Sequence, residues 1–269
     1  MEHYKILKRG LAGLAALLVA FSLASCKKAP AAPQRIPAVP KLRVLFVGNS
    51  LTFVNDLPAL TAGLAKARNS KMEYEMYAPG GYTLAQHSAD AALLGKINEG
   101  NWNYVVLQEQ SQIPAFPWAE TQVFPFARKL SQTIRDANPG VKVAFYMTMA
   151  RKNGDAQNGK YFPEVGTYAG MQKKLNEAYT RMALENQGVL VPVGEVWEKV
   201  REQDPALDLY GDEVHPNQAG TYLAACVFYA VLFADSPVGL PHPPQIGDYA
   251  AETIQKLAYE ATKPAKPAL

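Results

Sequence analysis

The chain has 269 residues, of which 48% are hydrophobic, enough to fill the core of one large domain or two small ones. Its formal charge of +3 comes mostly from the first 26 residues, because the remainder holds 24 basic and 23 acidic residues. The composition excludes a wholly disordered chain, and neither the bulk charge nor any basic cluster supports a nucleic-acid partner.

Residues 1–25 have the layout of a secretory signal peptide, with three basic residues ahead of an apolar run at 11–23. The run is too short to span a membrane comfortably. It ends in Leu-Ala-Ser-Cys, which resembles the lipobox of bacterial lipoproteins, whose cysteine becomes the acylated first residue. We therefore expect export to the bacterial cell envelope, with Cys26 lipidated and anchored to a membrane surface. The alternative is a cysteine that simply follows a signal peptide.

The remaining chain divides into three parts. Residues 26–40 are rich in Pro and Ala without apolar periodicity, which predicts an extended tether. A folded domain is expected at 41–262, with a flexible tail at 263–269. Only Cys226 lies in the domain, so no disulfide can form within it, and its apolar surroundings predict a core residue. No CxxC or paired-histidine spacing indicates a metal site, and we expect no metal and no organic cofactor.

Short β-rich runs alternate with longer amphipathic segments through the domain. The expected strands are 42–48, 71–78, 103–108, 141–148 and 188–193. The expected helices lie near 57–68, 84–98, 119–137 and 166–187. Three of the strands are nearly continuous apolar runs, as strands covered on both faces should be. The alternation predicts an α/β fold, with right-handed βαβ crossovers and a mostly parallel five-stranded sheet between helices.

Three residues or short motifs mark the expected helix boundaries. Asp56 can cap the helix that follows it, and Asn-Pro-Gly at 138–140 stops the helix before it. Pro216 or Asn217 can begin the last long helix. These signals agree with the alternation of strands and helices.

Polar and glycine-rich turns follow three of the expected strands, at 48–50, 80–81 and 108–110. Ligands of open parallel sheets bind outside the carboxyl ends of the strands. Ser50 lies on the first of these turns, just before a helix, where backbone N–H groups favour negative charge. A serine there is well placed to attack a carbonyl carbon, with its own N–H holding the resulting oxyanion.

A nucleophilic serine needs a base, and the chain has four histidines. His3 lies in the leader, His87 in a helical pattern and His242 in a Pro-rich loop. His215 follows Asp212 by three residues in a turn, so the carboxylate can reach one imidazole nitrogen and leave the other free. Taken alone, such a turn more often has a capping role.

Two motifs together resemble a known family. "VGNSLT" near the start of the domain and "DEVHPNQAG" near its end are similar to the first and last conserved blocks of the SGNH, or GDSL-like, hydrolases. These are secreted esterases and lipases with a flavodoxin-like three-layer α/β/α sandwich. The resemblance implies that Ser50 is the nucleophile, Asp212 the triad acid and His215 the general base.

The resemblance also implies an oxyanion hole. It would be formed by the N–H groups of Ser50 and Gly81, the latter in "APGGYTLAQH", and by a side-chain amide after the third strand. The family usually supplies that amide from an Asn, whereas this chain has "QEQSQ", similar to the "QGESN" of sialate and acetylxylan esterase relatives. An ungapped match places Gln112 on the Asn. Gln108 and Gln110 remain alternatives.

These observations predict a membrane-tethered serine esterase that works through an acyl-enzyme, on a small-molecule or polysaccharide acyl ester. Acetyl groups on polysaccharide are the first substrate expected, from the likeness of "QEQSQ", and short acyl lipids the second. The alternative is a non-catalytic envelope lipoprotein that binds a glycan or a protein on a degenerate esterase scaffold. A nucleotide-binding protein is excluded by the absence of a P-loop lysine and of the glycine triplet of the dinucleotide motif.

Three further features have open interpretations. Phe116 and Trp118 could line the lip of a substrate pocket, although aromatic residues in such a stretch more often belong to the core. The segment 151–168 is irregular and long enough to cover a substrate, or it is a plain surface loop. Glu195 is interpreted as a structural or capping residue.

Overall fold

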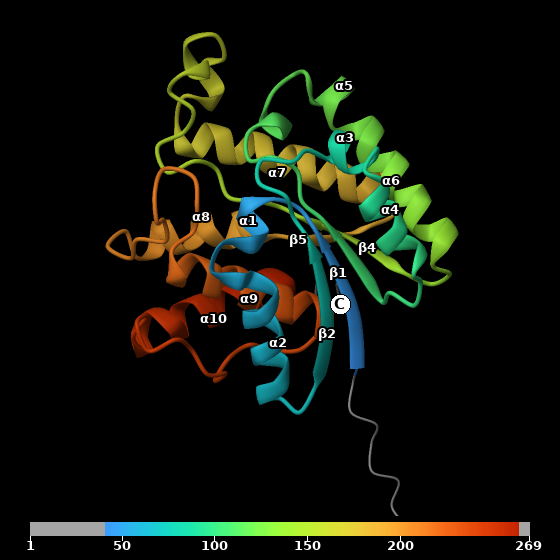
Figure 1. Ribbon diagram of the computed structural model, residues 1–269. Coiled ribbons are helices and arrows are strands. Elements are labelled where there is room, and N and C mark those ends of the chain that lie inside the picture. The colour runs from blue at the N-terminus through green and yellow to red at the C-terminus, as the bar shows by residue number, and fades with distance from the viewer. Residues whose placement is uncertain (1–40, 264–269) are drawn as a thin grey trace, which may run out of the picture. The chain divides into compact units, whose positions relative to one another are not determined.

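The structure, a computed structural model, describes residues 41–263 (Figure 1). The expected signal peptide, the tether with Cys26, and the tail beyond its first residue lie outside these residues and stay predictions. Among the residues that are described, no helix is long and apolar enough to cross a membrane.

Five parallel strands form one sheet in the order β2-β1-β3-β4-β5. The strands are β1 (Lys41–Val47), β2 (Lys71–Tyr77), β3 (Tyr104–Leu107), β4 (Lys142–Tyr146) and β5 (Val189–Val191). This order is that of flavodoxin-like folds, and it confirms the predicted three-layer α/β/α sandwich with a sheet that is wholly parallel. The direction of winding reverses between β1 and β3, where ligands of such folds bind.

Helices cover both sides of the sheet (Figure 1). One layer contains α3 (Leu84–His87), α4 (Ala91–Asn98), α5 (Ala119–Gln122), α6 (Phe124–Ala137) and α7 (Tyr168–Glu185). The other contains α1 (Ser50–Phe53), α2 (Leu57–Ala67), α8 (Val193–Gln203), α9 (Gln218–Phe233) and α10 (Asp248–Thr262). Short 3-10 turns are η1 (Val54–Asp56), η2 (Ile113–Ala115), η3 (Asn158–Lys160) and η4 (Pro163–Val165).

The central strand β1 is buried on both faces, which explains its unbroken apolar sequence. Its residues Val44 to Val47 have no exposed surface and divide between two hydrophobic cores, one beneath each helical layer. Cys226 of α9 is also fully buried, as expected, and burial raises the pKa of its thiol to about 12. The thiol is therefore protonated at neutral pH and packs as a small apolar side chain.

The register brings three loops to one edge. Val47 pairs with Tyr77 of β2 and with Leu107 of β3, so these neighbouring strands end at the same level. The turns that follow them, at 48–50, 78–83 and 108–112, consequently share the carboxyl edge of the sheet. The candidate site residues of the first half of the chain lie on these turns.

The expected helix caps are present. Asp56 accepts a hydrogen bond from Ala59 N at 3.2 Å, and Asn138 ends α6. Asn217, rather than Pro216, caps α9 by accepting from Gly220 N at 3.0 Å. Each cap satisfies a backbone donor or ends a helix at the residue that the sequence indicates.

Two helices expected as continuous are divided. The segment 84–98 is interrupted because the Asp90 carboxylate caps α4, accepting from the backbone N–H groups of its first turn. The segment 119–137 is interrupted before α6, which has Pro125 in its first turn, where a missing N–H costs nothing. The helix α10 was not anticipated as a separate element.

Gly220 is required by close packing between α8 and α9. A Cβ atom there would lie 2.3 Å from the Leu209 carbonyl oxygen and 2.4 Å from Cη2 of Trp197. We expect Gly220→Ala to lower the free energy of unfolding by about 3 kcal/mol, the upper end of the usual cost of overpacking, because the clash involves the backbone and a buried indole. Urea unfolding measures the change.

Gly63, on the exposed side of α2, is the matched control. A Cβ atom there would have no neighbour within 4 Å. Gly63→Ala should raise the free energy of unfolding by about 0.5 to 1 kcal/mol, the gain in helix propensity. Equal effects of the two substitutions would contradict the packing argument.

Candidate active site

Ser50 is held at the end of β1 by a short turn. Asn49 accepts a hydrogen bond from Leu51 N at 3.2 Å through its side chain, which caps α1. The chain therefore passes from the last buried residue of the strand to the first residue of the helix within three residues. Ser50 is partly exposed at this point, on the carboxyl edge of the sheet.

A buried amide fixes this turn. Gln108 Oε1 accepts from Asn49 N at 2.8 Å and from Thr52 Oγ1 at 2.9 Å, while Gln108 Nε2 donates to Asn49 Oδ1 at 2.9 Å. A Cβ atom on Gly48 would lie 2.4 Å from Gln108 Oε1, so only glycine fits there. Asn49 Nδ2 donates in turn to the carbonyl of Tyr82 at 2.8 Å. The side-chain amide of Gln108, fully buried, is thus committed to structure.

The three residues predicted as a triad lie in one hydrogen-bonded chain. His215 Nε2 is 2.9 Å from Ser50 Oγ, and His215 Nδ1 is 2.8 Å from Asp212 Oδ2. A carboxylate partner makes Nδ1 the protonated nitrogen, which leaves Nε2 to accept the serine proton. The geometry needed for proton transfer from Ser50 is therefore present.

The carboxylate of Asp212 is held ionised by local backbone. Its Oδ1 accepts from His215 N at 2.6 Å and from Val214 N at 2.7 Å. The hydrogen bond from His215 N, followed by that from the imidazole, lowers the pKa of Asp212 to about 2. The carboxylate of Asp212 is therefore ionised at neutral pH.

The turn that carries this pair is closed on itself and fastened to the sheet. Gly211 N donates to the His215 carbonyl at 2.8 Å, and Asn217 N donates to the Leu209 carbonyl at 3.0 Å. Tyr210 Oη donates to the carbonyl of Ala150, beyond the end of β4, at 2.6 Å. These contacts bring a segment from the end of the domain to Ser50.

A small cavity of about 170 Å³ opens at Ser50. It is lined by Asn49, Ser50, Leu51, Gly81, Gln110, Ser111, Arg151, Val214 and His215. Gly81 has φ +72°, a left-handed conformation that favours glycine, so its main chain can pass close to the cavity. Of the predicted site residues, Ser50, His215 and Gly81 thus line one space, and Asp212 is connected to it through its hydrogen bond with His215.

Only one of the three candidate glutamines shares that space. Gln110 lines the cavity, and its Oε1 accepts from the backbone N–H groups of Gln112 and Ile113 at 2.9 and 3.3 Å. These bonds orient the amide and leave its Nε2 as a donor. Gln112, the first choice from the sequence, is not among the lining residues, and its Oε1 is buried without a partner among the described residues.

Two buried titratable residues support the loops and were not anticipated. Glu109 has no exposed surface, and burial raises the pKa of its carboxyl to about 7. Its two oxygens accept from Leu84 N at 3.1 Å and from Gln110 N at 2.6 Å, so it joins the loop after β2 to the loop after β3. His87 is also fully buried, and its Nε2 donates to the Gly48 carbonyl at 2.8 Å. Burial lowers the pKa of His87, which favours the neutral ring.

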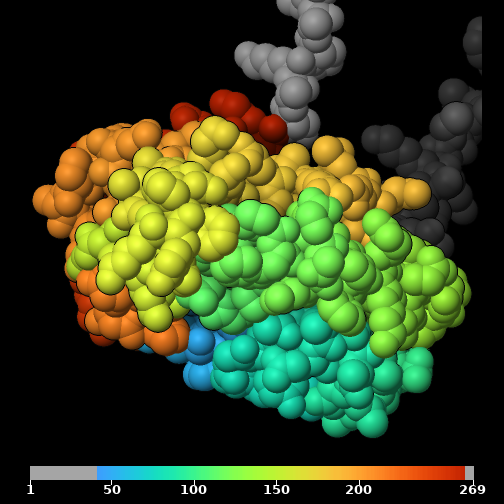
Figure 2. All heavy atoms as spheres, turned by 90° about the horizontal axis from the view of Figure 1, so that it is seen from above, coloured from blue at the N-terminus to red at the C-terminus, as the bar shows by residue number. Residues whose placement is uncertain are grey.

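The segment 151–168 is a packed loop that begins at the cavity. Its Lys152 N donates to the Glu213 carbonyl at 2.9 Å. Figure 2 looks from above onto the carboxyl edge of the sheet. It shows the yellow segment around residue 160 beside the orange surface of residues 200–215. Arg151, its first residue, was not singled out by the sequence because no motif marks it.

Phe116 and Trp118 do not line the cavity at Ser50. They stack on each other with ring centroids 4.3 Å apart, and both meet Phe162 of the loop edge-on. Phe116 is almost completely buried. Their visible role is to fasten the loop after β4 to the loop after β3.

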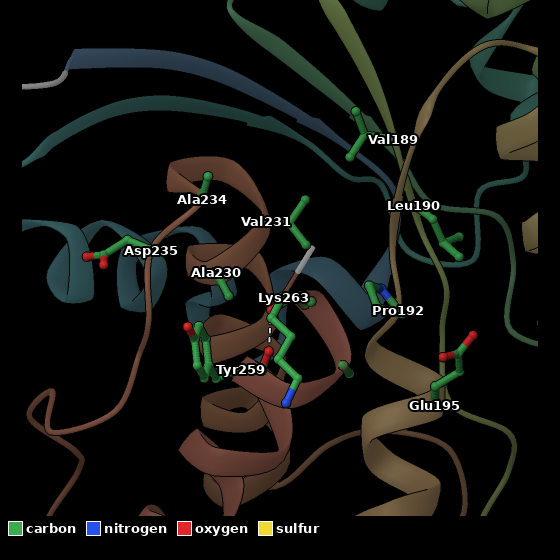
Figure 3. Close-up of a pocket in the computed structure, with 12 residues that line it drawn as sticks. Val189, Leu190, Pro192, Glu195, Ala230, Val231, Ala234, Asp235, Tyr259 and Lys263 are labelled. Carbon is green, nitrogen blue, oxygen red and sulfur yellow. Dashed lines mark hydrogen bonds between the residues drawn. The ribbon is translucent and has the colours of Figure 1, made fainter. Parts of the chain in front are cut away.

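A larger cavity lies elsewhere. It has a volume of about 400 Å³ and opens between β5, the start of α8 and the ends of α9 and α10 (Figure 3). Its lining is mostly apolar, with Glu195, Asp235 and Lys263 as the charged residues. None of the predicted catalytic residues lines it.

Comparisons with known proteins address the fold. A scan against protein-family models found no match, and neither did a search of curated proteins. Among solved structures, a DUF4886 family protein from Bacteroides uniformis matches with a TM-score of 0.69 at 17% identity, over 82% of this chain and 94% of that one. A protein from Slackia heliotrinireducens, described as a candidate SGNH hydrolase, matches with a TM-score of 0.60 at 28% identity, over 71% of this chain and 99% of that one.

A third solved structure is a variant of the acetyl-xylooligosaccharide esterase Axe2 from Geobacillus stearothermophilus. It matches with a TM-score of 0.51 at 16% identity, over 72% of this chain and 95% of that one. These likenesses confirm that the chain has an SGNH/GDSL-like hydrolase fold.

The raised pKa of Glu109 predicts a pH-dependent stability. The folded protein keeps this proton up to about pH 7, whereas the unfolded chain releases it near pH 4.5. The contribution of Glu109 to the free energy of unfolding is therefore fully present below about pH 4.5, and it is lost as the pH rises through about 7. We expect the free energy of unfolding to fall by about 3 kcal/mol across this window, and Glu109→Gln to remove that fall.

Urea unfolding at a series of pH values measures the effect. Glu177→Gln, on the exposed surface of α7, is the control and should retain the decline. An identical pH dependence in the Glu109→Gln protein and the unsubstituted protein would contradict the assignment.

Proposed function

We propose that the protein is a serine esterase of the SGNH type that hydrolyses short acyl esters. The observation that carries the proposal is the hydrogen-bonded chain from Ser50 through His215 to Asp212 at the mouth of a cavity. A scaffold that only binds a glycan or a protein would not require this arrangement of hydroxyl, imidazole and carboxylate. The fold that the chain shares with known esterases supports the same proposal.

In the proposed reaction, His215 Nε2 removes the proton of Ser50 Oγ as that oxygen attacks the ester carbonyl carbon. Asp212 stabilises the imidazolium that forms. The carbonyl oxygen becomes an oxyanion, and the imidazolium protonates the leaving alcohol as the carbon–oxygen bond breaks. A water molecule, deprotonated by His215, then attacks the acyl-enzyme and releases the carboxylic acid, which regenerates Ser50.

We propose that three donors hold the oxyanion: Ser50 N–H, Gly81 N–H and Nε2 of Gln110. Gln110 replaces Gln112 in this role because it lines the cavity and its carbonyl side is already fixed by two backbone donors. The amide therefore needs little reorganisation when charge develops, which is how such donors lower a barrier.

The cavity supports a small acyl group. Its volume of about 170 Å³ corresponds to about six water molecules at about 30 Å³ each. An acetyl or similarly short acyl group fits, and the alcohol part must lie outside, on an open surface. This favours the acetyl ester of a polysaccharide over a long-chain lipid, in agreement with the "QEQSQ" likeness; short acyl lipids are the second choice.

Removal of the nucleophile or the base tests the proposal. We expect Ser50→Ala and His215→Gln each to lower kcat for p-nitrophenyl acetate by at least about a thousandfold, because the triad acts as a unit. His242→Gln is the matched control, since His242 also pairs with a carboxylate, Asp248, but lies outside the cavity. Hydrolysis at an unchanged rate in the Ser50→Ala protein would rule out this nucleophile.

Gln110→Glu tests the third oxyanion donor. A glutamate can still accept the backbone hydrogen bonds that hold the residue, but it lacks the N–H and adds negative charge. We expect kcat to fall by about a hundredfold to a thousandfold with a smaller change in KM. Gln112→Ala removes an amide that does not line the cavity and should retain most of the activity; the reverse ranking of the two variants would return the role to Gln112.

A further inference from the structure

Among the residues that line the cavity at Ser50, Arg151 carries a permanent positive charge. The same lining residues include no carboxylate. The Arg151 side chain is 26% exposed, so part of it can be reached from the cavity. A substrate held at Ser50 would therefore share this cavity with a cationic side chain.

The guanidinium is poorly satisfied by the protein. Its Nη1 atom lies 3.6 Å from Asp155 Oδ2, an ion pair longer than a hydrogen bond. Its Nε is buried and has no hydrogen-bond partner in the part of the chain that the structure describes. Buried donors nearly always have partners, so the unpaired Nε shows that the protein does not fully satisfy this guanidinium, and the exposed part of the side chain is where a ligand could bind.

Asp155 does not fully occupy Arg151. The carboxylate of Asp155 is fully buried, and its two oxygens already accept from Asn158 N at 3.1 Å and from Asn158 Nδ2 at 2.9 Å. Its main role in the structure is to order the loop 151–168. Arg151 contributes a long ion pair to this cluster and keeps its other donors.

The main chain around Arg151 is firmly held. Ala150 N donates to Gln172 Oε1 at 2.7 Å, and Lys152 N donates to the Glu213 carbonyl at 2.9 Å. The residues on both sides of Arg151 are thus tied to α7 and to the turn that carries the candidate base. A side chain presented from a fixed backbone suits the positioning of a ligand.

We propose that Arg151 forms an anion subsite that binds a carboxylate of the substrate next to the scissile ester. The inference rests on the proposed esterase function and narrows its substrate class. Guanidinium groups bind carboxylates through two parallel hydrogen bonds, and few groups are better matched to the free donors of Arg151. The substrates are then acyl esters of acidic sugars, with the carboxylate in the alcohol part, or half-esters of dicarboxylic acids, with it in the acyl part.

Two pairs of esters distinguish a carboxylate in the alcohol part of the substrate from one in the acyl part. For the alcohol part, m-acetoxybenzoate is compared with neutral m-acetoxybenzamide; for the acyl part, p-nitrophenyl hydrogen succinate is compared with p-nitrophenyl butyrate. The quantity measured is the ratio of kcat/KM between the anionic and the neutral member. We expect the ratio in at least one pair to fall by about tenfold or more in Arg151→Gln, the size expected for a lost charged hydrogen bond. Arg151→Lys should give a smaller loss, because lysine keeps the charge without the fork.

Arg128→Gln is the matched control, since Arg128 is an exposed arginine of α6, and the ratio should not change. A purely structural role for Arg151, through Asp155, would lower stability and leave the ratio of every pair unchanged, and that result would overturn the inference. The inference would also be overturned if a stably folded Arg151→Gln protein kept the same ratio of kcat/KM between the anionic and the neutral ester in both pairs.

A binding experiment separates this inference from the proposed function. Titration calorimetry of the Ser50→Ala protein with m-acetoxybenzoate, m-acetoxybenzamide and succinate needs no turnover. Carboxylate binding that is lost in the Ser50→Ala, Arg151→Gln protein would support the subsite even if no ester were hydrolysed. No Arg151-dependent binding of either carboxylate would overturn the subsite, even if p-nitrophenyl acetate were hydrolysed through Ser50.

Discussion

The buried side-chain amide of Gln108 is the interaction on which the candidate site depends. It joins the end of β3 to the turn after β1, and through Asn49 it reaches the loop after β2. Both ends of the amide are satisfied, so its burial carries no unpaired polar atom. Because three loops converge on one small group, Ser50 and Gly81 are placed by the same contact, and Gly48 is glycine for lack of space.

Much of this architecture could be predicted from local sequence. The strands are visible because a sheet covered on both faces needs continuous apolar runs, and Asp56 and Asn217 mark helix starts because a cap must satisfy a backbone donor. Asp212 and His215 could be paired because they are three positions apart, so a single turn brings their side chains together. The meeting of His215 with Ser50 was expected from the comparison of the four histidines and from the family resemblance, because no local pattern encodes it.

Local sequence could not show which of the three glutamines lines the cavity. An ungapped match counts residues, whereas the direction of each side chain depends on how the chain bends into η2, and that bend is stabilised by Gln110 itself. Arg151 has no sequence signal because its position depends on contacts with α7 and with the turn at 211–217. Asp90 and Pro125 were visible in the sequence, but their effect on helix continuity competes with amphipathic periodicity.

The closed turn at 209–217 has a consequence for how the proposed activity could be lost. Acid and base are preassembled there within four residues, and one contact between distant parts of the chain, from His215 to Ser50, completes the set. Segments of this kind open with less free energy than a central sheet. A local opening of this turn, which requires the release of Tyr210 from Ala150 and of Glu213 from Lys152, would move both groups away from Ser50 together while the central sheet stays folded. The proposed activity would then be lost without unfolding of the sheet.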